Sequence, residues 1–396
     1  ILEMLMAGSV ISKYWGVYLN DFMRLMGWNA NTNLTFGSFH IDIAPIIIVA
    51  FFTVLLVFGT KIGARVDGAM TVLKIAIVVF VVIVGFFYVK ASNFTPFIPP
   101  SQPASTVEGS SAVTGVMTQP LWQFATGMTP SVYGVPGILS GAALVFFAFI
   151  GFDVVASASE ETKNPHKNVP LGIGVGMLLI IVMYMLVAIV TTGMVSYKDL
   201  AKQDSPSLAT AFELVGADWA AKIISFGIVL GLATVIMVLL LGLTRIVFAM
   251  SRDGLLPRGL SKTGKHGTPA ALQIVVGAVV ALVAAFFDIG VLSDMVNIGT
   301  LSAFTLVAIS IPIMRKKRPD LPRAFKMPGN PWIPILIAVA NFWLMLNLSV
   351  LTWIRFLVWL VIGFAIYFSY GYWHARLGKG DLSETLSDET DRAVNG

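Results

Sequence analysis

Ten stretches of about 20 mainly apolar residues, bounded by charged residues, proline or glycine, restrict the fold of this chain most. The hydrocarbon core of a bilayer is about 30 Å thick and an α-helix rises about 1.5 Å per residue, so each stretch matches one membrane crossing. Lipid cannot satisfy an open strand edge, and the stretches lack the alternation of a β-barrel, which favours helices throughout. We predict an all-α polytopic membrane protein, with spans at residues 1–23, 41–59, 67–89, 137–158, 172–195, 223–249, 270–287, 290–313, 332–350 and 352–373.

The composition excludes other classes of protein. Apolar residues make up 57% of the 396 residues and charged residues only 12%, against about 25% in an ordinary soluble domain. A soluble or disordered chain with this many apolar residues would expose large apolar patches. A disulfide scaffold is excluded because the sequence contains no cysteine. We therefore expect the lipid bilayer to cover most of the surface.

The distribution of lysine and arginine predicts the orientation of the spans. If the spans alternate, the loops at 60–66, 159–171, 250–269 and 314–331 and the C-terminal tail share one side. Close to the spans this side carries 16 of the 26 basic residues, and the other side carries six. Basic loops favour the cytoplasm, so we expect this side, with the C-terminus, to be cytoplasmic. The basic run at 315–318 is then a topology anchor, and we expect no nucleic-acid partner.

Two loops on the opposite side are long enough to contain structure of their own. Residues 91–136 are rich in Pro, Ser, Thr and Gly, and we predict a short lid-like helix near residues 121–124. A loop of this length is uncommon unless it is functional or flexible. Residues 196–222 are polar and show helical periodicity near residues 208–214.

Five charged residues fall inside the predicted spans: Glu3, Lys13, Lys74, Asp153 and Arg245. A charge in hydrocarbon costs about 2.5–3.5 kcal/mol on insertion scales, so each needs an explanation. Lys74 lies about nine residues into its span, roughly 14 Å and close to the midplane, with no acid within one helical turn. It can lose its proton there, or its ammonium can replace a bound cation, and both roles suit ion coupling. The alternative is a structural lysine bonded to helix-end carbonyls. We expect Lys13 to extend to the outer interface and Arg245 to be structural.

The span at 137–158 contains a predicted break. Gly151 and Asp153 interrupt its lower half, and both residue types are unfavourable within a helix. Exposed backbone is tolerated at this depth only where it lines a cavity, and many transporters form their midplane sites from discontinuous helices. The alternative is an unbroken helix with a packing glycine.

Glu3 and Ala7 lie one helical turn apart, on the same helix face. A small residue beside an acid leaves room for a ligand, and the acid can meet a cationic side chain or a proton. The alternative is that Glu3 pairs with Lys13 or with a residue outside this chain.

Motifs of several other function classes are absent from the sequence. It has no HExxH, GxSxG or Walker motif, and its four histidines lie in loops or at span ends. A membrane enzyme, a metal site and a haem cofactor are therefore disfavoured. No TVGYG-like filter is present, which weakens the case for a channel. We expect no cofactor and no catalytic residue.

Several segments resemble one transporter superfamily. Residues 141–153 and 159–165 closely resemble the sixth helix and the following loop of the amino acid–polyamine–organocation superfamily. Residues 244–257, 296–304 and 318–323 resemble, in order and spacing, its eighth helix, its tenth helix and the loop after the tenth. The resemblance covers nearly the whole chain, and the nearest group is the bacterial relatives of the cationic amino acid transporters.

The resemblance implies a division of the chain. The superfamily has a five-plus-five inverted repeat followed by two further helices, and the ten spans here match its third to twelfth. The chain begins at Ile1 with neither a start methionine nor a signal peptide, so we expect a longer parent protein that carries the first two helices. The expected parts are a transporter core at 1–313, two additional helices at 314–373 and a cytoplasmic polar tail at 374–396.

The resemblance also implies site residues. The sixth-helix backbone would receive the substrate amine, the ring of Phe147 would cover the bound amino acid, and third-helix residues would line the side-chain pocket. The substrate carboxylate would meet the first helix, which lies outside this chain. The implied substrate-binding residues are Glu3, Ala7, Leu144, Phe147, Ile150 and Gly151.

Two further residues are implied in ion coupling. Lys74 resembles the lysine that occupies the place of a sodium ion in proton-coupled relatives, and Thr234 lies at a depth suited to facing it. The expected function is a proton-coupled amino acid permease of the cell membrane that works by alternating access, with amino acid and protons as partners. An exchanger without proton coupling and a non-transporting amino acid sensor are the alternatives. The sequence leaves open whether the substrate is neutral or cationic and whether the protein has an accessory subunit or forms an oligomer.

Overall fold

The predicted helices are present in the computed structural model, which is almost entirely helical over the residues it describes. The described residues are 1–28, 32–36, 39–59, 64–106, 115–151, 164–203, 206–262, 268–320 and 327–375. Asp153 and most of the predicted C-terminal tail lie outside these residues.

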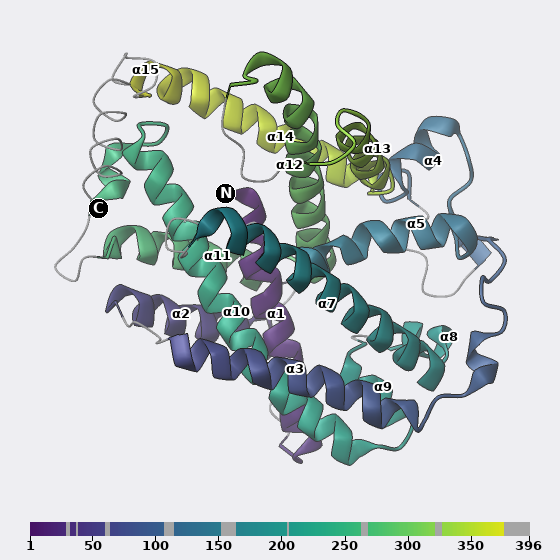
Figure 1. Cartoon of the computed structure of the whole chain (residues 1–396). Coiled ribbons are helices and arrows are strands. Elements are labelled where there is room, and N and C mark those ends of the chain that lie inside the picture. The colour runs from purple at the N-terminus through teal and green to yellow at the C-terminus, as the bar shows by residue number, and fades with distance from the viewer. Residues whose placement is uncertain are drawn as a thin grey trace.

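Within the described part, ten long helices coincide with the ten predicted spans (Figure 1). The long helices are α1 (Leu2–Leu25), α2 (Ile43–Val57), α3 (Ala64–Phe86), α5 (Gly134–Val145), α7 (Pro165–Met194), α10 (Asp218–Arg252), α11 (Ala270–Phe286), α12 (Ile289–Lys317), α13 (Trp332–Leu346) and α14 (Val350–Ile366).

Short elements lie between them and at the C-terminal end. Two antiparallel strand pairs, β1 with β2 and β3 with β4, belong to the connections. The short elements are β1 (Asn33–Phe36), β2 (Phe39–Asp42), η1 (Ala91–Phe94), β3 (Gln102–Pro103), η2 (Ala104–Thr106), α4 (Leu121–Thr126), β4 (Ser131–Val132), η4 (Phe146–Phe149), α8 (Tyr197–Ala201), α9 (Leu208–Leu214), η6 (Arg258–Ser261), η7 (Tyr367–Gly371) and α15 (Tyr372–His374).

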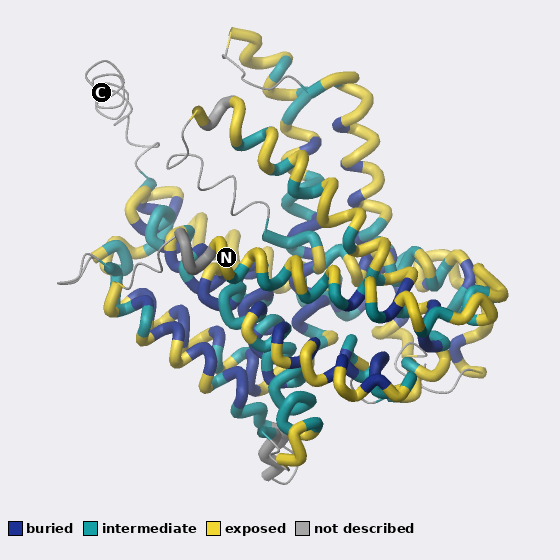
Figure 2. The backbone as a smooth tube through the Cα atoms, turned by 60° about the horizontal axis from the view of Figure 1, so that its bottom comes forward, coloured by how far each residue is buried: buried dark blue, intermediate teal, exposed yellow. Residues whose placement is uncertain are grey.

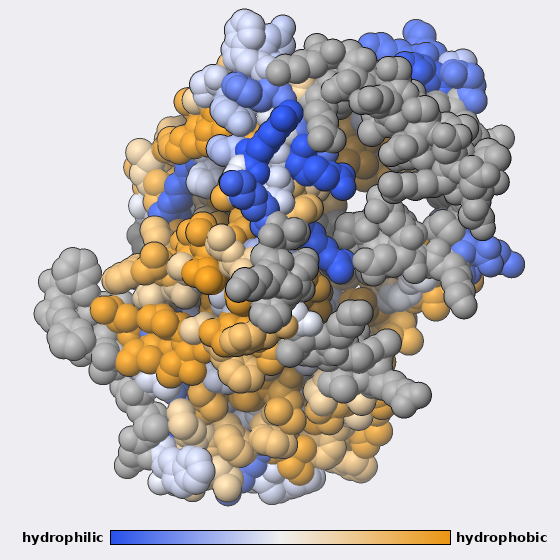
Figure 3. Space-filling model, turned by 90° about the vertical axis from the view of Figure 1, so that its left-hand side faces the viewer, coloured by the Kyte–Doolittle hydropathy of each residue, from blue (hydrophilic) through white to orange (hydrophobic). Residues whose placement is uncertain are grey.

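The outer helices have the length and the surface of membrane spans. Over the described residues, α3, α7, α10, α12 and the continuous helix from Val350 to His374 are long and apolar enough to cross a bilayer, and α2, α5 with η4, α11 and α13 are shorter apolar helices. Only 6% of the most apolar stretch of α7 is buried inside the protein, so nearly all of that stretch can face lipid. Figure 3 shows hydrophobic residues spread over much of one side face, with hydrophilic residues gathered mainly toward its upper part.

Helix α1 is less apolar than these spans and lies in the interior. It packs against α2, α10, α11 and α12, and its inward positions are mostly small or polar. Figure 2 shows the contrast between buried stretches of the inner helices and exposed stretches of the outer ones. Surrounding helices therefore shield the polar face of α1 from lipid, which is where membrane proteins place such residues.

Glycines let the helices approach each other closely. A Cβ at Gly277 of α11 would lie 2.9 Å from the Cβ of Thr53 on α2, and a Cβ at Gly227 of α10 would lie 2.6 Å from the Cγ1 of Ile77 on α3. Both distances are too short for a side chain. Helix pairs in membranes use small residues in this way because close packing, and not the hydrophobic effect, holds them together.

The predicted lid-like helix is α4, and it rests on the turn between α13 and α14. The backbone N–H of Leu121 donates to the carbonyl of Leu348 at 2.9 Å, and that of Val350 donates to the carbonyl of Gln119 at 3.1 Å. The Trp122 indole N–H donates to Oδ1 of Asn347 at 2.9 Å. The outer loop is thus fastened to the C-terminal helices. The predicted helix near residues 208–214 is also confirmed, as α9.

The side chain of Lys13 is held by two partners and is only 9% exposed. Nζ forms an ion pair with Asp42, at the start of α2, and donates to the carbonyl of Ala284 on α11 at 3.0 Å. The extension of Lys13 to the outer interface stays a prediction, and the alternative in which Lys13 pairs with Glu3 is not supported by these contacts. Asp42 is 29 residues from Lys13 in sequence, so helical periodicity could not identify it as the partner.

Candidate functional site

The predicted break in the span at 137–158 is confirmed over its described part. The α-helix ends at Val145, a 3₁₀ turn follows through Phe149, and Ile150 is extended with φ −71° and ψ 141°. Gly151 has φ +118°, a conformation open to glycine and unfavourable for other residues. The chain has therefore left the helical path by Ile150, and Gly151 continues in a conformation that favours glycine.

Side chains from two other helices bond to the backbone at the break. The buried amide of Asn297 on α12 donates from Nδ2 to the carbonyl of Leu144 at 3.0 Å. The hydroxyl of Tyr184 on α7 donates to the carbonyl of Ala148 at 2.7 Å. A helix end leaves carbonyls without intrahelical partners, and these donors satisfy two acceptors of the disrupted segment.

Phe147 and Ile150 pack against the largest hydrophobic cluster among the described residues. The buried members of this cluster come from α1, α2, α10, α11 and α12, and they include Ala7 and Met4 of α1. Three of the predicted substrate-binding residues, Ala7, Phe147 and Ile150, therefore belong to this cluster or pack against it.

Glu3 lies one turn from Ala7, next to α12. A Cβ at Gly299 would be 3.8 Å from the Cβ of Glu3, an ordinary contact distance. Asn297, two residues earlier on α12, holds the carbonyl of Leu144. One short segment of α12 therefore lies beside both the acidic position on α1 and the broken helix.

The side chain of Leu144 does not join this group. It is 49% exposed, and only its backbone is connected to the site, through the bond to Asn297. This agrees with a role for its backbone and gives no support to a side-chain contact with a ligand. Gly151 is partly buried at the end of the described segment.

Lys74 and Thr234 meet at one residue of α10. The aliphatic stem of Lys74 lies against Gly231, where an added Cβ would be 3.3 Å from the lysine Cγ. The hydroxyl of Thr234 donates to the carbonyl of the same Gly231 at 2.9 Å. A small cavity of about 170 Å³ lies here between α3, α7 and α10, lined by Lys74 and otherwise by apolar residues. The bond of Thr234 lies within α10, so the pairing of Thr234 with Lys74 stays a prediction.

Helix α10 connects the two groups of residues. Gly231 and Val235 line the cavity at Lys74, and Ile236 and Leu240 belong to the cluster that contains Ala7. A shift of α10 against α3 would therefore also move part of the hydrophobic cluster against which Phe147 and Ile150 pack.

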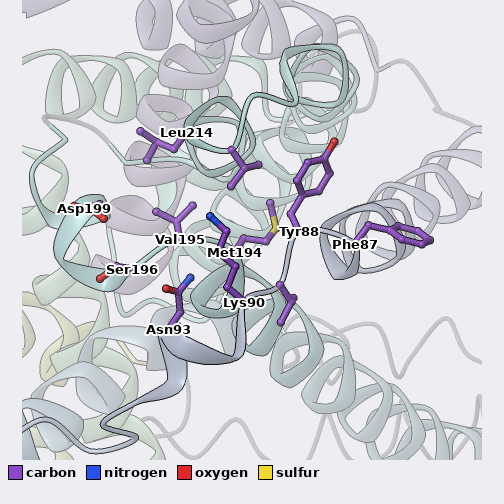
Figure 4. Close-up of a pocket in the computed structure, with 11 residues that line it drawn as sticks. Phe87, Tyr88, Lys90, Asn93, Met194, Val195, Ser196, Asp199 and Leu214 are labelled. Carbon is purple, nitrogen blue, oxygen red and sulfur yellow. The ribbon is translucent and has the colours of Figure 1, made fainter.

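An outer pocket of about 530 Å³ was not predicted from the sequence. It lies between the ends of α3 and α7 and the short helices α8 and α9 (Figure 4). Its polar groups come from Lys90, Asn93, Ser196 and Asp199, and Asn93 donates to the carbonyl of Gly193 at 2.8 Å. Asp199 also forms an exposed ion pair with Lys202, which favours a solvated surface pocket.

Sequence reasoning missed Asn297 and Tyr184. Among the polar residues within spans it examined the charged ones and Thr234, whereas these two donate hydrogen bonds through an amide and a hydroxyl. A buried amide in an apolar span must also find a hydrogen-bond partner, so polar neutral residues at midspan were the available signal. The partners themselves lie 153 and 36 residues away in sequence.

Residues 5–372 match the amino acid permease family, which is nearly the entire chain. The chain therefore belongs to this family and is a multi-pass membrane transport protein.

The relatives carry names of several transporters. The chain is 40% identical over 387 residues to the branched-chain amino acid permease BcaP of Bacillus subtilis, covering 96% of this chain and 76% of that protein. It is 35% identical to the methylthioribose transporter of the same bacterium, with the same coverage. It is 34% identical to the vacuolar cationic amino acid transporter 4 of Arabidopsis thaliana, over 71% of this chain and 42% of that protein. The predicted resemblance to this superfamily is confirmed.

Proposed function

We propose that the chain is the main part of a secondary active transporter that moves amino acids across the cell membrane by alternating access, in symport with protons. The observation that carries the proposal is the broken helix at residues 145–151, whose Phe147 and Ile150 pack against the apolar cluster that contains Ala7 of α1. The basic loops and the C-terminus would face the cytoplasm. Residues 1–313 would form the transporting core and residues 314–373 the two additional helices.

The backbone of the break suits the ammonium group of an amino acid. Ile150 is extended, so its carbonyl leaves the direction of the helical hydrogen bonds, and we propose that it receives the ligand. Broken helices in transporters bind substrates and ions through such freed groups near the bilayer midplane. We place the substrate ammonium at this backbone and the substrate side chain between Phe147 and Ala7.

The proposed substrate has an apolar, branched side chain. The cluster that contains Met4 and Ala7, and against which Phe147 and Ile150 pack, is apolar. The relative named as a branched-chain permease supports the same class. Glu3, one turn away, supports a cationic side chain as the second candidate, in agreement with the relatives named as cationic amino acid transporters. Competition of labelled leucine uptake by isoleucine and valine, against lysine and arginine, separates the two.

Lys74 is the proposed coupling residue. When charged, its ammonium would hold α3 against α10 near Gly231, and loss of the proton would weaken that contact. Holding a charge inside an apolar cavity is costly, so gain or loss of the proton would favour one packing of the two helices over the other.

The test is leucine uptake by the intact permease in proteoliposomes. With Lys74→Ala we expect loss of the uptake driven by a pH gradient, because no group would remain to carry the proton. Lys90→Ala is the control, since Lys90 is an exposed lysine just beyond the outer end of the same helix. If Lys74→Ala leaves gradient-driven uptake unchanged, Lys74 has no part in coupling. Counterflow of leucine in the wild type that is independent of the gradient would then indicate an exchanger.

A further inference from the structure

The amide of Asn297 is fully buried but only partly bonded. Its exposed fraction is 0%, and Nδ2 donates to the carbonyl of Leu144 at 3.0 Å. Oδ1 is buried and has no hydrogen-bond partner among the described residues. A buried amide oxygen without a partner costs free energy, and such groups in native proteins call for an explanation.

The surroundings of Asn297 do not require a polar residue for packing. Its neighbours on α12, Val296 and Ile298, are fully buried and apolar, and Ala143, next to Leu144 on α5, is also fully buried. Leucine has nearly the same shape as asparagine and buries no amide. The fold itself would therefore accept an apolar residue at this position.

The carbonyl that Asn297 holds lies directly before the break. Leu144 is the penultimate residue of α5, and the 3₁₀ turn that leads to Ile150 begins two residues later. Fixing this carbonyl to α12 fixes the direction in which the helix ends. Tyr184 of α7 holds the carbonyl of Ala148, but its hydroxyl is on an exposed side chain. Asn297 is thus the buried one of the two supports.

We infer that Asn297 is a positioning residue of the substrate site, which orients the freed backbone of the broken helix toward the substrate ammonium. The inference rests on the proposed function, because it assigns Asn297 to the same site. Asn297 acts through the backbone of Leu144 and not by covering the substrate. Its removal should loosen the break while the helices remain packed.

The experiment compares Asn297→Leu, Asn297→Gln and Thr300→Val in the intact permease. Thr300 is the matched control, because it is also fully buried on α12 but its hydroxyl donates within the helix, to Val296 at 2.9 Å. For Asn297→Leu we expect the KM of leucine uptake to rise about tenfold, because the loss of one well-placed hydrogen bond weakens binding by about this factor. The melting temperature should stay close to that of the wild type, and Asn297→Gln, which keeps the amide, should recover part of the KM. Thr300→Val should leave the KM unchanged.

A second measurement does not depend on transport. The 396 residues contain no cysteine, so Ala143→Cys provides a thiol at a fully buried position of α5. Combined with Asn297→Leu, it should react with a maleimide several times faster than in the wild-type background, and combined with Thr300→Val it should not. If the Asn297→Leu background labels faster but the wild type takes up no leucine, the proposed function is refuted and the role of Asn297 at the break stands. An unchanged KM and labelling rate in Asn297→Leu, or equal changes in Thr300→Val, would overturn the inference.

Discussion

The buried ion pair between Lys13 and Asp42 offers the sharpest test of how α1 is held in the interior. Lys13→Met keeps the length of the side chain and removes its charge. The change deletes two interactions, the ion pair to Asp42 and the hydrogen bond to the carbonyl of Ala284. Since these partners belong to α2 and to α11, one substitution weakens the contact of α1 with both helices.

The expected magnitude follows from the exposure of the two side chains. Removing one partner of a buried pair costs about 3–5 kcal/mol, because the other charge remains without compensation. Lys13 is 9% exposed, but Asp42 keeps 25% of its side-chain surface, so water can reach the remaining carboxylate. We therefore expect the lower end of the range, about 3 kcal/mol.

The assay is thermal unfolding of the purified protein in detergent, followed by tryptophan fluorescence. Lys13→Met should lower the melting temperature clearly, and the double variant Lys13→Met with Asp42→Asn should regain most of the loss, because replacing both charges removes the uncompensated carboxylate. Lys222→Met is the control, since this lysine is exposed on α10. A melting temperature of Lys13→Met equal to that of Lys222→Met would refute the reasoning. So would a double variant that is no more stable than Lys13→Met.

Two other predictions concern helix contacts. Gly277→Ala should destabilise the protein by about 1–3 kcal/mol, because the new methyl group overlaps Thr53 and forces α11 away from α2; a melting curve checks this, with Gly172→Ala on the open surface of α7 as the control. Trp122→Phe removes the indole hydrogen bond to Asn347, worth about 1 kcal/mol, and should speed proteolysis of the outer loop without changing the global melting temperature. Equal cleavage rates in the wild type and Trp122→Phe would contradict this.

The spans and the break could be predicted because their causes are local in sequence. Hydropathy over about 20 residues determines which segments enter lipid, and all ten predicted spans correspond to described helices. Gly151 has a positive φ directly after the 3₁₀ turn, so a residue type unfavourable within a helix was sufficient to predict a break in this part of the span. The helix at Leu121–Thr126 was likewise found from its own residues.

Partners across the fold could not be predicted in this way. Lys13 was expected to reach the interface because lysine commonly does so near a helix end. Its partner Asp42 lies on another helix, and only the packing of α1 against α2 brings the two together. Asn297 was missed for a similar reason, because its function depends on a carbonyl 153 residues away. One sequence alone contains no information on which helix faces meet.

The contact of α4 with the turn between α13 and α14 has a consequence for any shortened version of this protein. A version that stopped at residue 313 would retain every residue assigned to binding or coupling. It would nevertheless remove Asn347 and Leu348, which receive hydrogen bonds from Trp122 and Leu121, and with them the surface on which α4 rests. A minimal version designed without the last two helices would need another support for α4.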